Sequence, residues 1–362
     1  MINLDDTKSI LETQGGDAVI ISTRAFPKQI TTSFRDVGSM QFDPGYKEVE
    51  NIILCGMGGS RFPGLIAYYL FKDSLKIPFI VCDDYILPEF VNEKTLVILS
   101  SYSGTTEEVV HMGKAAFAKK AKIVGYCVGG ELASFLESNN LPRYIFDPTL
   151  NPSGQPRIGF GYAIGALFGI LAKLNLIKGK MYESLGDELE KDCADLEKIS
   201  LEFDFESKTG QNRAKDFALE MLEKYPYFIV AEHITGVGNA IQNQINETSK
   251  NISSYRVIPE LNHHLMEGLK HPHTHSEMAL FVMIESPLYS PRVQKRYEVT
   301  KDVVNQNNIK TITYKTKGSS KIGDVLEIAT FGSFLSMYLA ALYGVDPAKI
   351  PYVDYFKKQL KA

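Results

Sequence analysis

Hydroxyl side chains crowd a short turn near residue 100, which the sequence places between an apolar strand (95–99) and a helical segment. The turn reads Ser100-Ser101-Tyr102-Ser103-Gly104-Thr105-Thr106 and contains no Lys or Arg. At such a turn, free backbone N–H groups and the positive end of a helix dipole favour a phosphate. The sequence therefore predicts a charge-neutral cradle for a small phosphorylated metabolite, with the hydroxyls of Ser101, Ser103 and Thr106 as donors.

A more ordinary role is also open to this turn. Ser103 or Thr105 would cap the following helix, and a Glu in the first helical turn would complete a capping box. Capping does not need four hydroxyls, so we expect capping and phosphate binding together.

A second turn, rich in glycine, follows the earlier apolar strand near residues 50–55. It reads Gly56-Met57-Gly58-Gly59-Ser60 and lacks the GxGxxG spacing of dinucleotide-binding proteins. Taken alone, it fits a phosphate role and simple close packing of strand and helix equally well. Two strand-ending turns of this kind within one α/β unit indicate a sugar-phosphate site, to which Gly59 and Ser60 would contribute.

The elements that must position these turns alternate along the chain. Strand patterns near 50–55, 78–82, 95–101, 122–127 and 143–146 are separated by helical patterns, which predicts a doubly wound parallel sheet of the α/β class. A stretch with three prolines, 147–156, predicts a boundary between domains 1–152 and 153–362. A similar alternation follows, with strands near 227–231, 253–258, 278–284 and 310–314. Acidic helical material near 181–215 precedes this second half, and helices close the chain.

Composition limits the class of partner. The chain has 362 residues, 44% of them hydrophobic and 23% charged, with a net charge of −4, so we expect no nucleic-acid partner. The longest apolar run is too short and too rich in glycine for a membrane span, and the N-terminus lacks the pattern of a signal peptide. None of the four cysteines forms a CxxC pair, which is typical of reduced core residues in a cytoplasmic protein.

Several polar residues are ambiguous by themselves. Glu247 lies on a helical pattern, where a lone Glu is usually solvated, and a catalytic role would need a pocket that raises its pKa. Arg157 follows a proline turn, and Lys357 could simply belong to a basic helix end. The alternating segment His271-Pro272-His273-Thr274-His275 resembles a ligand set, but a zinc site would need ligands from elsewhere, so we predict no metal.

Together these pieces resemble the bifunctional phosphoglucose/phosphomannose isomerases, a family of the sugar isomerase (SIS) fold group. The resemblance runs from about residue 50 to the C-terminus and rests on the following segments: Gly56-Met57-Gly58-Gly59-Ser60, Asp84-Tyr85, Pro88, Ser101-Tyr102-Ser103-Gly104, Thr106-Glu107-Glu108, Pro156-Arg157, Asn246-Glu247, Pro259-Glu260, His263, Gly344-Val345-Asp346-Pro347, Asp354-Tyr355 and Lys357. It implies two SIS-type three-layer α/β/α domains and a C-terminal helical segment. The chain departs from the family pattern at Arg61, Pro63 and His264.

The resemblance also implies roles. Glu247 would move the proton between C1 and C2 of the sugar, His263 and Lys357 would open the ring, and Arg157 would stabilise the enediolate. No cofactor is implied, the substrate is a sugar phosphate, and the protein would be a homodimer in which His263 reaches the partner's site. Two alternatives stay open, namely another SIS-fold sugar-phosphate isomerase and a non-catalytic SIS sugar-phosphate sensor. The sensor would not need Glu247, His263 and Lys357 together.

Overall fold

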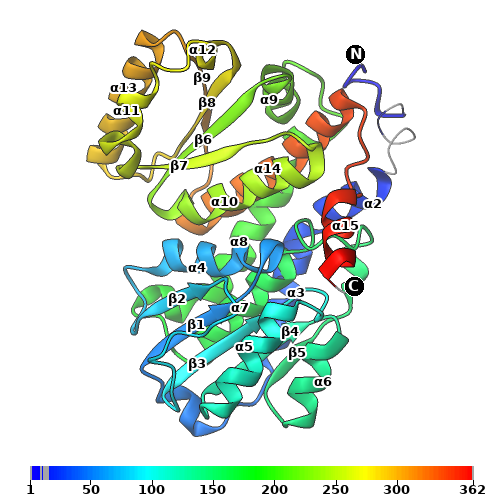
Figure 1. Ribbon diagram of the computed structural model, residues 1–362, viewed down its shortest axis with the longest axis vertical. Coiled ribbons are helices and arrows are strands. Elements are labelled where there is room, and N and C mark those ends of the chain that lie inside the picture. The colour runs from blue at the N-terminus through cyan, green and yellow to red at the C-terminus, as the bar shows by residue number, and fades with distance from the viewer. Residues whose placement is uncertain (1, 9, 11–15, 361–362) are drawn as a thin grey trace.

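The computed structural model describes residues 2–8, 10 and 16–360, and within them nine strands form two parallel sheets (Figure 1). The first sheet has the order β2-β1-β3-β4-β5, and the second has the order β7-β6-β8-β9. The strands of the first sheet are β1 (Asn51–Cys55), β2 (Phe79–Cys82), β3 (Thr95–Ser100), β4 (Lys122–Cys127) and β5 (Arg143–Ile145). Those of the second sheet are β6 (Tyr225–Ala231), β7 (Ser254–Ile258), β8 (Ala279–Glu285) and β9 (Lys310–Lys315).

Helices cover both sheets. They are α2 (Gly16–Arg24), α3 (Phe26–Gly38), α4 (Phe62–Phe71), α5 (Glu107–Ala118), α6 (Gly130–Ser138), α7 (Gly161–Lys173), α8 (Lys180–Phe203), α9 (Arg213–Met221), α10 (Thr235–Gln244), α11 (Leu265–Gly268), α12 (His275–Met278), α13 (Pro291–Gln306), α14 (Lys321–Tyr343) and α15 (Pro351–Leu360). Short helical turns are η1 (Pro44–Lys47), η2 (Gly58–Ser60), η3 (Pro148–Leu150), η4 (Glu232–Ile234), η5 (Ile245–Ser249) and η6 (Glu260–His263). The predicted fold class is confirmed.

The side chains of β1 and β3 divide between two cores because successive residues of a strand point to opposite faces. Ile52 and Leu54 of β1 join the larger core, which continues into the second half of the chain. Ile53 and Cys55 join a smaller core beneath α5 and α6. All six residues of β3 are buried, as expected for a central parallel strand covered on both faces.

Helices α4 and α10 join the two halves. At Gly236, on α10, an added Cβ would lie 2.5 Å from the carbonyl oxygen of Leu65 on α4, so only glycine allows this close approach. Helix α8 contacts both α3 and α14 and so spans the two halves on another side. Because the larger hydrophobic core runs through this junction, the relative position of the two sheets is fixed by packing.

The boundary at residue 152 stays a prediction. Helix α7 follows it, yet packs against α3 and α4, so the chain returns to the first sheet before it enters the second. Helix α14 is long and apolar enough to cross a membrane, but 94% of its most apolar window is buried inside the protein. That burial is typical of a core helix.

Candidate active site

The glycine-rich turn after β1 is held against the hydroxyl-rich turn after β3. The Ser100 hydroxyl donates to the carbonyl oxygen of Ser60 at 2.6 Å, and the Tyr102 N–H donates to Ser60 Oγ at 2.8 Å. At Gly59, an added Cβ would lie 2.7 Å from the carbonyl carbon of Pro156. The glycine-rich turn therefore packs between the hydroxyl-rich turn and Pro156, the residue that precedes Arg157.

The hydroxyls of the second turn pair with each other. Ser101 Oγ lies 2.8 Å from Thr106 Oγ1 and accepts the Gly104 N–H at 3.1 Å, while Ser103 Oγ lies 2.9 Å from Thr105 Oγ1. Helix α5 begins after Thr106, whose hydroxyl makes no cap hydrogen bond. The prediction that Ser103 or Thr105 caps this helix is wrong, because these hydroxyls bond within the turn. The first N–H groups of α5 consequently have no capping side chain that an anion would need to displace.

Arg157 is buried where the two halves meet, with only 1% of it exposed. Its Nε donates to Thr248 Oγ1 at 3.0 Å, and its Nη1 donates to Gln155 Oε1 at 2.7 Å. Its Nη2 donates to the carbonyl oxygens of Pro347 and Ala348, at 2.7 and 3.1 Å. Burial lowers the pKa of Arg157. The guanidinium therefore ties together the segment after the proline turn, the end of α10 and the turn after α14.

Glu247 lies in η5, a π-helical segment that continues α10. Its Oε2 accepts a hydrogen bond from Arg157 Nη1 at 3.3 Å, and 28% of its side chain is exposed. Burial raises the pKa of Glu247, while the charges of Arg157, Lys357 and Lys250 act to lower it. A partly accessible carboxylate with a raised pKa is suited to take a proton and return it. The raised pKa that the catalytic interpretation of Glu247 requires is thus present in direction, and the catalytic role itself stays a prediction.

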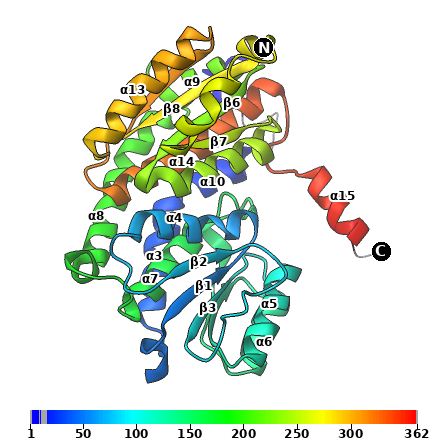
Figure 2. The ribbon, with the colours of Figure 1, turned by 60° about the vertical axis from the view of Figure 1, so that its left-hand side comes forward.

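Lys357 approaches this carboxylate from α15. Its charge is among those that lower the pKa of Glu247. Figure 2 shows α15 standing away from the rest of the protein, joined to it by the turn that Arg157 holds. Every residue of α15 is exposed, including Tyr352 (86%) and Phe356 (60%). The helix therefore carries a predicted site residue on an apolar surface that this chain leaves uncovered.

Lys250 also belongs to this cluster, although sequence reasoning did not select it. Its backbone is left-handed, with φ of 58°, at the end of η5. Its Nζ donates to the carbonyl oxygens of Thr248 and Asp346, at 3.1 and 2.5 Å. Burial, reinforced by the charge of Arg157, lowers the pKa of Lys250 to about 8. A lysine at the end of a polar helical segment is typical of an ordinary surface residue, so no sequence signal marked it.

His263 is not brought to Glu247 within this chain. Glu247 precedes β7 and His263 follows it, and the strand between them has five residues, each rising about 3.3 Å. Asn262 donates to Thr300 of α13 at 2.9 Å, whereas η5 packs against α14. Figure 1 accordingly shows α11, which follows His263, on the side of the second sheet away from α15. His263 is exposed there.

The histidines between 271 and 275 do not form a common ligand set. His271 and His273 stack edge to face at 4.8 Å, and His275 Nε2 lies 3.2 Å from the Tyr227 hydroxyl. Across the residues that the structure describes, no group of three His, Cys, Asp or Glu side chains could hold a metal ion.

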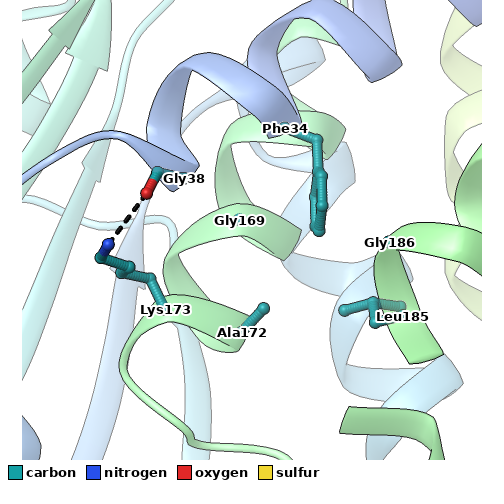
Figure 3. A pocket seen from close by; sticks show the side chains of 7 residues that line it. All are labelled: Phe34, Gly38, Gly169, Ala172, Lys173, Leu185 and Gly186. Carbon is teal, nitrogen blue, oxygen red and sulfur yellow. Dashed lines mark hydrogen bonds between the residues drawn. The ribbon is translucent and has the colours of Figure 1, made fainter. Parts of the chain in front are cut away.

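A pocket of about 330 Å³ lies elsewhere, between α3, α7 and α8 (Figure 3). Phe34, Ala172 and Leu185 give it an apolar lining, and Lys173 Nζ donates to the carbonyl oxygen of Gly38 at 2.9 Å. None of its lining residues is a predicted site residue. Among the lining residues that the structure describes, the one cationic group is the Lys173 amine, which already donates to Gly38. The two turns are therefore the better candidates for a phosphate site.

Comparisons with known proteins identify the family and the fold of the chain. A family model described as the bacterial phospho-glucose isomerase C-terminal SIS domain matches residues 210–360. A bifunctional phosphoglucose/phosphomannose isomerase of Caldicellulosiruptor bescii is 31% identical over 344 residues, covering 92% of this chain and 96% of the relative. A protein of the same name from Aquifex aeolicus is 26% identical over 314 residues, covering 86% and 91%. The structure of a hypothetical protein from Thermus thermophilus has a TM-score of 0.74 at 17% identity, covers 98% of this chain and 92% of its own, and is similar in fold.

Proposed function

Because the chain belongs to the family of bifunctional phosphoglucose/phosphomannose isomerases, we propose that it interconverts glucose 6-phosphate and mannose 6-phosphate with fructose 6-phosphate. The observation that carries the proposal is the continuous set of contacts from the phosphate turns to a carboxylate. Ser100 and Tyr102 hold Ser60, Gly59 packs against Pro156, and the adjoining Arg157 binds Glu247. A ligand phosphate at the turns would fix the sugar carbons relative to the base.

Proton transfer is assigned to Glu247. An aldose becomes a ketose when the C2 proton moves to C1 through a cis-enediolate, and one carboxylate can remove the proton and return it. Negative charge develops on the enediolate oxygens, and the buried guanidinium of Arg157 is fixed in place to stabilise it. Binding of the remote phosphate by Gly59, Ser60, Ser101, Ser103 and Thr106 provides the orientation.

Ring opening must come first because hexose phosphates are mostly cyclic in water. It requires an acid at the ring oxygen and a base at the anomeric hydroxyl. Lys357 supplies one of these groups from α15, close enough to Glu247 to influence its pKa. His263 supplies the other from a second subunit. The reaction needs neither a metal nor an organic cofactor, because proton transfer and charge stabilisation are both assigned to side chains.

The protein acts as a homodimer in this proposal. Two observations support it: His263 lies at the far end of β7 from Glu247, and α15 exposes Tyr352 and Phe356 beside the site. A second copy would cover the apolar face of α15 and bring His263 of the partner subunit to Glu247. The four cysteines are free thiols, which supports a cytoplasmic location.

Mixed dimers test the shared site. Co-expressed Glu247→Gln and His263→Ala subunits should regain about a quarter of wild-type activity, because half of the dimers in a random two-fold mixture are hybrids with one intact site. Each variant alone should be inactive. If both residues worked within one chain, the mixture would stay inactive, which would overturn the shared site without touching the isomerase assignment.

Turnover of separate epimers tests the reaction itself. Purified protein should form fructose 6-phosphate from glucose 6-phosphate and from mannose 6-phosphate, with rates within about two powers of ten, because one steric difference at C2 is worth only about 1–3 kcal/mol. Binding of the sugar phosphates without turnover would instead identify a sensor. Glucose 6-phosphate turnover alone would reduce the protein to a single-function isomerase.

A further inference from the structure

Two cysteines are neighbours at the ends of adjacent strands, and one of them directly precedes the glycine-rich turn. Cys55 is the last residue of β1, Cys82 is the last residue of β2, and the two are paired in the parallel register. Neighbouring strands lie about 4.7–4.9 Å apart, which falls within the Cα separation that a disulfide spans. Both residues are free thiols in the structure.

The two thiols differ in acidity. Their mutual interaction lowers the pKa of Cys82 to about 7 and raises that of Cys55. Cys82 Sγ also lies 3.5 Å from Met112 Sδ. Cys82 is 8% exposed and Cys55 is fully buried, so a small oxidant would reach Cys82 first.

We propose that Cys55 and Cys82 form a reversible disulfide, and that its formation on oxidation weakens binding at the sugar-phosphate site. With a peroxide as oxidant, the Cys82 thiolate attacks one peroxide oxygen, and the O–O bond breaks to give a sulfenic acid and water. The Cys55 sulfur then attacks the Cys82 sulfur, the S–O bond breaks, and a second water leaves. Two thiols and one hydrogen peroxide become one disulfide and two waters. A dithiol reductant reverses the change by thiol–disulfide exchange.

Closing this bond would disturb the site because β1 leads directly into the glycine-rich turn and the residue after β2 contacts the end of that turn. Gly56 follows Cys55, and an added Cβ there would lie 2.7 Å from the Ser60 carbonyl oxygen. The turn is therefore closely packed at this point. The Gly56 N–H donates to the Cys82 carbonyl oxygen at 3.3 Å. The residue after Cys82, Asp83, pairs with Arg61 at 2.8 Å, on the other side of the same turn. Any shift of the strand ends as they adopt disulfide geometry would therefore be passed to the Ser60 cradle.

The experiment compares reduced and peroxide-treated protein. The reduced enzyme is assayed first, so that failure of the isomerase assignment is seen separately. Peroxide should then link the peptides that contain Cys55 and Cys82, with a loss of about 2 Da, and raise KM for fructose 6-phosphate about fivefold, the equivalent of one lost turn hydrogen bond of about 1 kcal/mol. Dithiothreitol should restore both values.

Two variants distinguish oxidation of the Cys55–Cys82 pair from oxidation of other cysteines. Cys82→Ala should keep its activity in peroxide, whereas Cys127→Ala should still lose activity, since Cys127 is a buried cysteine at the end of β4 in the same sheet. If Cys82→Ala folds poorly, peptide mapping of the wild-type protein still decides. Absence of the Cys55–Cys82 link in peroxide-treated protein would overturn the proposal. A disulfide that forms without any change in KM would overturn the coupling to the phosphate site.

Discussion

Replacing Glu247 by Gln removes the proposed base and leaves its surroundings nearly unchanged. The amide oxygen can still accept the bond from Arg157 Nη1, which is 3.3 Å long in the structure, so the contact between the two halves should survive. The amide cannot take a proton from carbon. Loss of a general base typically costs about 100- to 10,000-fold in rate, equivalent to about 3–5 kcal/mol of activation free energy. We expect kcat to fall by that factor or more, with KM nearly unchanged.

The assay follows both turnover and exchange. Wild-type protein in deuterium oxide should place solvent deuterium at C2 of the aldose product, and Glu247→Gln should not. Glu202→Gln is a matched control, because Glu202 is also a partly buried Glu paired with an arginine, Arg213, but is not a predicted site residue. Its kcat should stay near the wild-type value. Isomerisation by Glu247→Gln at a near wild-type rate, or an equal loss in Glu202→Gln, would refute the assignment of the base.

Three further predictions concern the same cluster and the turns. Lys250→Met should shift the acid limb of kcat to higher pH, because the lysine charge lowers the pKa of Glu247 and a carboxylate acts as a base only above its pKa; an unchanged or lower limb would contradict this. Ser103→Ala should raise KM about fivefold and leave kcat unchanged, since one hydrogen bond to the phosphate is worth about 1 kcal/mol, and equal turnover of free glucose would exclude the cradle. Exhaustive chelation should leave activity unchanged and His273→Ala should be nearly silent, whereas activity lost to a chelator and restored by zinc would overturn the mechanism.

Hydrophobic patterning was sufficient to predict the strands. Runs such as 95–99 are uniformly apolar because parallel strands are covered on both faces, and the structure places β3 at Thr95–Ser100. The two turns were recognisable for a related reason, since glycine and hydroxyl residues directly after an apolar strand mark its carboxyl end. The local sequence did not predict the hydrogen-bond partners of these hydroxyls correctly. Ser103 and Thr105 looked like helix caps, and their hydroxyls instead pair with each other.

Long-range contacts explain what the sequence could not reveal. Lys250 binds the carbonyl oxygen of Asp346, 96 residues further along the chain, and no local pattern encodes that contact. The separation of His263 from Glu247 depends on which helix each segment packs against, α13 or α14. The exposed apolar face of α15 likewise depends on how the turn after α14 leaves the body of the protein. Each feature is set by tertiary packing, which cannot be predicted from the hydrophobic periodicity of the sequence.

The cations around Glu247 have two opposing effects on the proposed reaction. Burial raises the pKa of Glu247, and the charges of Arg157, Lys250 and Lys357 oppose this by favouring the ionised form that acts as a base. The same charges weaken its basicity, which slows proton removal. Once the proton has moved, the negative charge lies on the enediolate, where Arg157 can stabilise it. The protonated Glu247 is then neutral and no longer competes with the enediolate for Arg157. A site with fewer cations would hold a stronger base that is ionised less often, and it would leave the enediolate without a counter-charge. In the proposed mechanism, the cluster therefore stabilises the negative charge of the enediolate at some cost to the basicity of Glu247.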